Sequence, residues 1–266
     1  GDPALRLAYP KERVQTSEIN SALVSTGVID TLRALEKITI KGYVADKKGN
    51  KLRTFNGLVY PTVFDKEQTI VSLLNTNESA INYYAIEQGA DPGPFKPYQF
   101  NLQKNILYRG KVSVVNGEFS YSFMVPKDIS FAVGPGKISY YATNGKTDAN
   151  GYFKKIMVGG GARNVIADQE GPKVELYLND KNFINGGITN EKPVLYADLT
   201  DSSGINTLGS SIGHDISVIL DENSSKPVVL NDYYEAALNS YQSGRVRYPY
   251  SNLSEGQHRL SFKVWD

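Results

Sequence analysis

The apolar positions of this chain recur with a period of two from Glu36 onward. Residues 36–46 place Ile38, Ile40 and Val44 on one face, and mostly polar side chains on the other. This alternation is typical of a half-buried β-strand. Similar runs cover residues 57–65, 68–74, 137–143 and 152–158. Because Pro61 has no N–H to donate to a ladder, we expect the 57–65 strand at a sheet edge or a bulge.

The clearest local signal is a hairpin around Asn116-Gly117. A type I′ turn needs positive φ at both central positions, and this residue pair tolerates it. The flanking runs KVSVV and EFSYSFMV both alternate. They predict a buried stripe in the first half of the chain, made of Val112, Val114, Phe119, Tyr121, Phe123 and Val125.

The second half carries four strand-like runs, within residues 173–180, 192–201, 214–221 and 258–266. In the last run we expect Leu260, Phe262 and Val264 to face a core. Residues 231–244 are the only helix-like stretch, and they lack a sustained 3.6-residue stripe. We expect at most two helical turns there, capped by Asn231 or Asp232. Since strands do not alternate with helices, a parallel α/β sheet is disfavoured.

These patterns predict an all-β chain of two tandem antiparallel β-sandwich domains of the immunoglobulin-like kind. We expect residues 1–30 to be a linker at the end of an upstream domain, 31–164 a first sandwich and 165–266 a second, either complete or truncated. The glycine-rich stretch 159–172 marks the boundary, as a packed junction or a hinge. Residues 75–98 are proline-rich and irregular, which predicts a long loop.

The composition of the chain excludes several classes of function. The 266 residues contain 29 Lys and Arg against 28 Asp and Glu, a net charge of +1, which removes the electrostatic case for a nucleic-acid partner. No apolar run is long enough for a transmembrane segment. The chain has no Cys, so it holds neither disulfides nor a cysteine nucleophile. It opens at Gly1 without an initiator Met or a signal peptide, and we expect it to be a piece of a longer protein.

One motif invites a catalytic interpretation. Residues 209–213 match G-x-S-x-G around Ser211, and His214 and Asp215 follow at once. A nucleophile elbow needs a strand before the serine and a helix after it. Here a Gly/Ser loop leads into a strand, so we interpret the motif as a turn. We assign no catalytic residue.

The remaining polar candidates also favour structural roles. We expect His258 to be a packed, hydrogen-bonded residue. The segment from Asp198 fails the EF-hand pattern, because Thr200, Ser202 and Gly209 occupy ligand positions. Asx turns explain its acidic residues, although calcium held by backbone carbonyls remains an alternative. We therefore expect neither a metal site nor a cofactor.

Aromatic residues form two clusters, which favour either glycan binding or ordinary core and corner packing. The clusters contain Tyr83, Tyr84, Phe95 and Tyr98 in one stretch, and Tyr233, Tyr234, Tyr241, Tyr248 and Tyr250 in the other.

The strings GDPALRLAYP, GINT, GHDI and VWD, with most of the runs between them, together resemble the gingipain family of cysteine peptidases, and within it the PorU-like sortases of the type IX secretion system of Bacteroidota. GDPALRLAYP resembles the last strand of the catalytic domain, and most later runs resemble the segment behind it. The resemblance covers nearly the whole chain. It is most specific in the second half, where GINT, GHDI and VWD occur in the expected order.

The resemblance implies a parent protein that cleaves C-terminal sorting signals and transfers cargo to a surface lipopolysaccharide. The family's catalytic cysteine and histidine lie upstream of Gly1, so this chain is expected to be a non-catalytic accessory region. Its partners would be its own upstream peptidase domain and secretion-system proteins or cargo, at the outer-membrane cell surface or in the secreted fraction. The alternative is a free-standing surface adhesin or carbohydrate-binding module. A peptidase domain upstream of Gly1 in the gene would separate the two.

Overall fold

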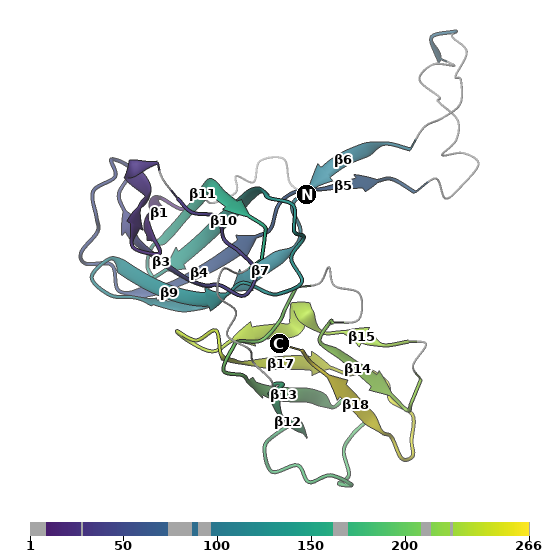
Figure 1. Cartoon of the computed structure of the whole chain (residues 1–266). Helices are drawn as coiled ribbons and strands as arrows, with labels where there is room; N and C mark the ends of the chain where they lie inside the picture. The colour runs from purple at the N-terminus through teal and green to yellow at the C-terminus, as the bar shows by residue number, and fades with distance from the viewer. Residues whose placement is uncertain are drawn as a thin grey trace. The chain divides into compact units, whose positions relative to one another are not determined.

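The fold is all-β, with several mainly antiparallel sheets (Figure 1). The computed structural model describes residues 9–27, 29–73, 87–89, 97–161, 170–208, 214–223 and 226–265. These form two compact units, residues 1–66 with 105–266 and residues 67–104. In the described part of the chain, no helix has the length and apolar character needed to cross a membrane.

The first half of the larger unit is a nine-stranded sheet that almost closes on itself. Its main order is β7-β4-β10-β11-β1-β3-β9, with β2 on β1 and β8 on β4. The β8–β9 hairpin links the last strand back to β4, so we call this sheet the near-barrel. The strands are β1 (Glu12–Ile19), β2 (Ala22–Leu23), β3 (Lys37–Ala45), β4 (Gly57–Phe64), β7 (Ile106–Arg109), β8 (Val112–Val114), β9 (Glu118–Met124), β10 (Gly134–Thr143) and β11 (Asp148–Val158). A single curved sheet replaces the two-layered sandwich expected for this half.

The hairpin at the Asn116-Gly117 turn is confirmed. Asn116 has a φ of 51° and Gly117 a φ of 78°, as a type I′ turn requires. All six predicted stripe residues are buried, and Phe123 is 1% exposed. Period-two alternation on β8 and β9 therefore sends these side chains into the near-barrel core.

Pro61 lies inside the sheet and not at its edge. Its strand β4 pairs with β10 on one side and with β7 and then β8 on the other. The Pro61 carbonyl accepts from the Gly110 N–H, at the point where β7 ends and β8 begins. The N and C=O of a strand residue point the same way, so the missing N–H faces this break and costs the ladder little.

Strand β1 lies in a stretch whose weak pattern allows a short strand but predicts no core. Within residues 1–30, expected as a linker, Glu12–Ile19 pairs antiparallel with β3 and parallel with β11. Val14 and Ile19 are buried in the near-barrel core. The strand ERVQTSEI has only these two aliphatic residues, so its pattern is too polar to stand out.

The second half of the larger unit is a β-sandwich with its own core. One sheet has the order β12-β13-β17-β16 and the other the order β15-β14-β18. The strands are β12 (Lys173–Leu178), β13 (Val194–Thr200), β14 (Ser217–Leu220), β15 (Val228–Val229), β16 (Tyr234–Ala236), β17 (Ser243–Pro249) and β18 (Leu260–Lys263). Leu260, Phe262 and Val264 pack against this core but are only half-buried, because β18 ends its sheet.

The helix-like stretch 231–244 is mostly extended. Only η3 (Asn231–Tyr233) is helical, a single 3-10 turn, and strands β16 and β17 follow. Neither Asn231 nor Asp232 caps it; the residue before it is Leu230, without a side-chain cap bond. Asn231 instead accepts from the Ile216 N–H and donates to the Thr207 carbonyl. Side-chain bonds to backbone groups far along the chain thus override the weak helical pattern.

Specific contacts join the near-barrel to the sandwich within the larger unit. Asn239, in the turn between β16 and β17, donates its N–H to the Lys111 carbonyl at 2.8 Å. Leu208 is fully buried with the near-barrel core residues. Asp128, between β9 and β10, accepts from Asn206 at 3.1 Å and contacts His214 Nδ1 at 2.7 Å. We call this set of contacts the junction.

The glycine-rich boundary begins as part of the near-barrel. The Gly159 N–H donates to the Leu32 carbonyl, and the Gly160 N–H donates to the Phe131 carbonyl. A Cβ on Gly159 would lie 2.4 Å from the Ala132 oxygen, so close packing explains this glycine. Residues 162–169 of the boundary lie outside the described part of the chain.

The smaller unit is a two-stranded ribbon. Strands β5 (Gln68–Val71) and β6 (Gln99–Leu102) pair antiparallel, with Ile70 opposite Phe100. Most of the long loop expected at 75–98 lies outside the described residues.

Candidate functional site

The G-x-S-x-G motif is not assembled into a triad by the described residues. Ser211 lies outside them. The Nδ1 atom of His214 contacts the Asp128 carboxylate at 2.7 Å, and its ring lies 5.0 Å from that of Trp265. Asp215 instead accepts from Asn231 at 3.2 Å. His214 therefore belongs to the junction between the two β-structures.

His258 is hydrogen-bonded, as expected, but it lies at the surface. Its Nδ1 contacts the Asp221 carboxylate and its Nε2 the Ser254 carbonyl, both at 2.8 Å. The Ser254 carbonyl, and after it Asp221, raises the pKa of the imidazole. These bonds fix the loop before β18, so His258 acts as a turn residue. Its side chain is 21% exposed, so the packed, hydrogen-bonded role expected for it is met in a surface turn and not in the core.

Asp201 forms the Asx turn that the sequence predicts. This buried carboxylate accepts from the Ser203 N–H and hydroxyl at 2.7 Å, and from the Gly204 N–H at 3.1 Å. Asp198 points elsewhere, to the outer face of the sandwich. In the part of the chain that the structure describes, no group of three His, Asp or Glu side chains could hold a metal ion.

The second aromatic cluster is largely structural. Tyr248 makes edge contacts with Tyr233 and Tyr250, at ring distances of 4.9 and 5.0 Å. Tyr234 is buried, and Tyr241 packs against the near-barrel core. In the first cluster, Tyr83, Tyr84 and Phe95 lie outside the described residues. Tyr98, in the smaller unit, is exposed and stacks on Phe100.

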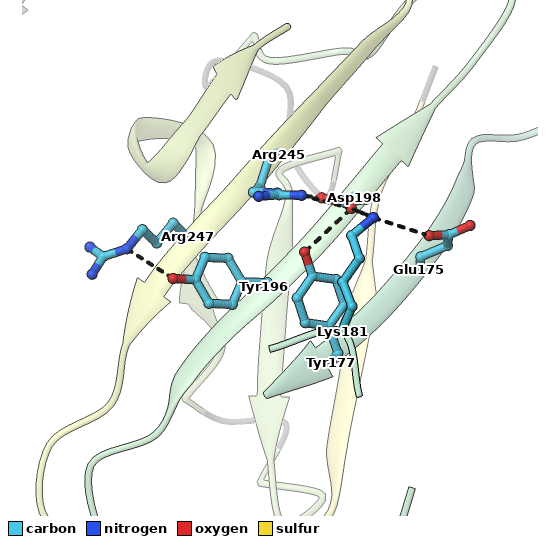
Figure 2. A network of polar contacts seen from close by, with 7 residues as sticks. All are labelled: Glu175, Tyr177, Lys181, Tyr196, Asp198, Arg245 and Arg247. Carbon is cyan, nitrogen blue, oxygen red and sulfur yellow. Dashed lines mark hydrogen bonds and ion pairs between the residues drawn. The ribbon is translucent and has the colours of Figure 1, made fainter. Parts of the chain in front are cut away.

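The outer face of β12, β13 and β17 carries a network of polar contacts, which Figure 2 shows. Strand register builds it in two rows, because residues opposite one another in antiparallel strands share a face. We call this surface the tyrosine–arginine face. One row is Tyr177, Tyr196 and Arg247, and the other is Glu175, Asp198 and Arg245.

Asp198 is the centre of this face. Arg245 donates to both of its carboxylate oxygens, with Nη2 to Oδ2 at 3.0 Å. Lys181 Nζ lies 2.8 Å from Oδ2, and the Tyr177 hydroxyl donates to the same oxygen at 3.3 Å. The hydrogen bonds from Arg245 contribute most to lowering the pKa of Asp198 to about 2. Asp198 therefore stays ionised, and holds both cations in place.

The rings of Tyr177 and Tyr196 are held by contacts with each other and with Arg245. Tyr177 and Tyr196 stack with centroids 5.4 Å apart and an interplanar angle of 19°. The Arg245 guanidinium lies 5.7 Å from the Tyr196 centroid and 6.0 Å from the Tyr177 centroid. Such cation–π contacts fix long side chains that would otherwise lose entropy on binding. The face is thus preorganised.

Arg247 differs from its neighbours. It is exposed, and its one side-chain bond among the described residues is from Nε to the Tyr196 hydroxyl, at 3.4 Å. Its guanidinium therefore keeps donors for an external acceptor. Preorganised Tyr and Arg side chains are the residues that dominate binding energy in protein interfaces. The face suits recognition and offers no activated nucleophile.

Sequence reasoning missed this face. Its side chains come from VELYL, VLYADLT and SGRVRYP, and the last of these was not recognised as a strand. Alternation of Arg245, Arg247 and Pro249 with Val246 was the signal that was available. Knowing that β17 pairs with β13 requires the tertiary fold.

Among known proteins, similarity to this chain is found in solved structures. No family model matches it, and no curated protein matches it. The solved structure of dimeric latent PorU from Porphyromonas gingivalis matches with 31% identity and a TM-score of 0.55. Spo0M, a sporulation control protein from Bacillus subtilis, matches over 91% of each chain with 12% identity and a TM-score of 0.30, too low to carry an argument. The PorU match covers 100% of this chain and 24% of the PorU chain, so this chain is PorU-like along its whole length and spans about a quarter of that relative.

Proposed function

We propose that this chain is the non-catalytic accessory region of a cell-surface cysteine peptidase of the gingipain family, a PorU-like type IX secretion sortase. In this role it braces and presents an upstream peptidase domain at the outer membrane, and it docks partner proteins. The match to about a quarter of PorU supports a place inside a larger protein. The absence of any cysteine from this chain means that a cysteine nucleophile would lie elsewhere in that protein.

The junction is the observation that carries the bracing role. Asn239, Leu208 and the Asp128–His214 pair tie two separate cores together through hydrogen bonds and buried apolar contact. Buried contacts of this kind resist bending, whereas a bare glycine linker would allow domain motion. A coupled near-barrel and sandwich provides the fixed spacing that presentation of a catalytic domain requires.

The strand order supports an immunoglobulin-like assignment for the sandwich. The order β12-β13-β17-β16 corresponds to strands A-B-E-D, and β14 and β18 correspond to C and F. Sandwiches of this kind often serve as spacers and docking modules on cell surfaces, which is an argument from fold alone. The tyrosine–arginine face lies on the A-B-E sheet and provides the docking chemistry.

The test uses the full-length protein in cells. Residues 173–266 are deleted in one strain, and Arg247→Glu replaces the exposed guanidinium in another. Arg259→Glu is the matched control, since Arg259 is an exposed arginine on a different part of the sandwich. Surface attachment of cargo is then measured at matched protein levels.

We expect the deletion to abolish attachment and Arg247→Glu to reduce it, with Arg259→Glu close to wild type. Normal attachment by the deletion strain at normal protein level contradicts the bracing role. Normal attachment by Arg247→Glu alone contradicts docking through the tyrosine–arginine face.

A further inference from the structure

The loop that joins β12 to β13, residues 179–193, contains a tight turn at an Asn-Gly pair (Figure 1). The Gly187 N–H donates to the Ile184 carbonyl at 2.8 Å and closes a four-residue turn. Gly186 occupies the third position with a φ of 85°, as a type II turn requires. Asn185 is therefore the second residue of the turn, and it is exposed.

Little of the protein surrounds this turn. Ile184 is 78% exposed and Ile188 is 99% exposed. A Cβ on Gly186 would meet nothing within 4 Å. The closing bond of the turn uses the Gly187 N–H, and the Gly186 N–H has no acceptor among the residues that the structure describes. The Asn185-Gly186 peptide can therefore change its backbone angles without disturbing packed neighbours.

An exposed Asn-Gly pair can deamidate without an enzyme. The glycine nitrogen loses its proton to water or hydroxide and attacks the asparagine Cγ. A C–N bond forms there, and the side-chain nitrogen leaves as ammonia. The resulting cyclic imide adds one water at either of its carbonyls, and it opens to aspartate or to isoaspartate. Glycine favours this attack because no Cβ shields its nitrogen or restricts its backbone.

The chain contains several Asn-Gly pairs, and strand pairing or backbone hydrogen bonds restrain two of them. Asn150-Gly151 lies within β11, opposite Tyr141 and Tyr140 of β10. The Gly117 N–H, in the hairpin turn after Asn116, donates to the Phe55 carbonyl at 2.8 Å. Attack by either glycine nitrogen first requires local opening of the near-barrel. The full set is Asn56-Gly57, Asn116-Gly117, Asn144-Gly145, Asn150-Gly151 and Asn185-Gly186.

Side-chain hydrogen bonds restrain two further pairs. The Asn144 Oδ1 accepts from the N–H groups of Lys146 and Thr147, at 3.0 and 2.8 Å. The Asn56 Oδ1 accepts from the Asn116 N–H at 2.9 Å. These bonds fix the amide group that the glycine nitrogen would have to reach. The turn in the β12–β13 loop therefore differs from all four other pairs in its freedom to react.

We propose that Asn185 is a site of spontaneous deamidation in the folded protein, with water as the co-reactant and attack by the Gly186 nitrogen as the route. In the loop, Asp180 and Glu191 balance Lys181 and Lys192, so the product gives the loop one net negative charge. The isoaspartate product also lengthens the backbone of the turn by one methylene group.

The base of the loop should keep its structure after this reaction. Asn179 donates from Nδ2 to the Thr189 hydroxyl at 3.0 Å, and its Oδ1 accepts from the Val194 N–H at 2.9 Å. Both bonds lie outside the reacting turn. The modification therefore changes the charge of the loop that supplies Lys181 to the tyrosine–arginine face, and it leaves the sandwich folded.

The test incubates the folded 266-residue chain in warm, mildly alkaline buffer and follows each asparagine by peptide mapping with mass spectrometry. Conversion raises the peptide mass by about 1 Da, and chromatography separates aspartate from isoaspartate. Asn185 should convert at least about tenfold faster than the asparagine of any other Asn-Gly pair, because the others must first open locally. In guanidinium chloride, where this protection is lost, the rates of all the pairs should agree within about threefold.

Matched controls lie in the same loop. Asn182 and Asn190 are also exposed, but Phe183 and Glu191 follow them, so both should convert far more slowly than Asn185. Asn185→Asp reproduces one product, and its melting temperature should lie within about 2 °C of wild type.

Each other outcome overturns a stated part of the proposal. A rate at Asn185 no higher than at the other pairs of the folded chain removes the site. Aspartate without isoaspartate indicates direct hydrolysis and removes the attack by the Gly186 nitrogen. Rates that stay unequal in guanidinium chloride show that local sequence, and not the fold, selects Asn185. A clear loss of stability in Asn185→Asp contradicts an open turn.

Discussion

The side chain of Asn239 makes two hydrogen bonds to Ser113 across the junction. Its Oδ1 accepts from the Ser113 N–H at 2.8 Å, and its Nδ2 donates to the Ser113 hydroxyl at 3.0 Å. With the bond from the Asn239 N–H to the Lys111 carbonyl, a single turn residue makes three bonds to the β7–β8 segment of the near-barrel. Its φ of 59° is one that asparagine tolerates well.

Replacing Asn239 with glycine should therefore loosen the junction without straining the turn. Glycine accepts positive φ, so Asn239→Gly removes only the two side-chain bonds, at about 1 kcal/mol each. Hydrogen exchange should accelerate in peptides covering 111–115 and 237–241, with the strands of each core unchanged. Asn252→Gly, at a φ of 56° on an exposed turn, is the matched control. Unaltered exchange at Ser113 contradicts the pairing.

Burial depth should separate two phenylalanines that the sequence pattern treats alike. Phe123 is 1% exposed in the near-barrel core, whereas Phe262 is half-buried on β18. Phe123→Ala should lower the free energy of unfolding by about 3–5 kcal/mol, and Phe262→Ala by about 1–2 kcal/mol. Urea unfolding followed by circular dichroism measures both. Equal losses would show that the two sites are equally buried in solution.

Two glycines with the same backbone angle should respond differently to alanine. Gly117 has a φ of 78° and Gly145 a φ of 80°. A Cβ on Gly117 would lie 2.4 Å from the Leu52 oxygen, while a Cβ on Gly145 meets nothing within 4 Å. Gly145→Ala should cost about 1 kcal/mol for the left-handed conformation alone, and Gly117→Ala should cost clearly more. Comparable melting temperatures for the two variants would contradict the close approach at Leu52.

The parts of the fold that the sequence predicts are those with strong local patterns. Alternation locates β3, β8 and β9, and the residue pair Asn116-Gly117 fixes its own turn type. The polar strand β1 is in the sheet because β3 and β11 both pair with it, which no local signal encodes. Closure of the near-barrel likewise depends on β4 pairing with both β7 and β8 along one edge.

The candidate site was harder to predict for the same reason. In the sequence, Asp198 is only the first polar residue of a segment that fails the EF-hand pattern. Its partners Arg245 and Lys181 are 47 and 17 residues away in sequence, and strand pairing and a loop bring them together. Tyr60 and Tyr141 form no cluster along the chain, although sheet register places them opposite one another.

Acid should weaken the tyrosine–arginine face through Asp198. Its pKa is about 2 in the folded protein, against an ordinary value of 3.8, with Arg245 as the main cause. A carboxylate whose pKa is lowered by folding contributes stability above the unfolded value, and loses it as pH falls towards the folded value. The contribution should be full above about pH 5, decline between about pH 4 and 2, and vanish below. Because the side chain keeps 20% of its exposure, solvent screening limits the contribution to about 1 kcal/mol.

Asp198→Asn isolates this contribution, because asparagine keeps the shape and loses the charge. Urea unfolding at pH 6 should find the variant about 1 kcal/mol less stable than wild type, and the gap should narrow steadily between pH 4 and pH 2.5. Glu175→Gln lies on the same face, and its carboxylate reaches Lys181 only at 4.0 Å, so it should change stability little at any pH. A gap for Asp198→Asn that stays constant down to pH 2.5 would mean that Arg245 and Lys181 do not hold the Asp198 carboxylate in solution.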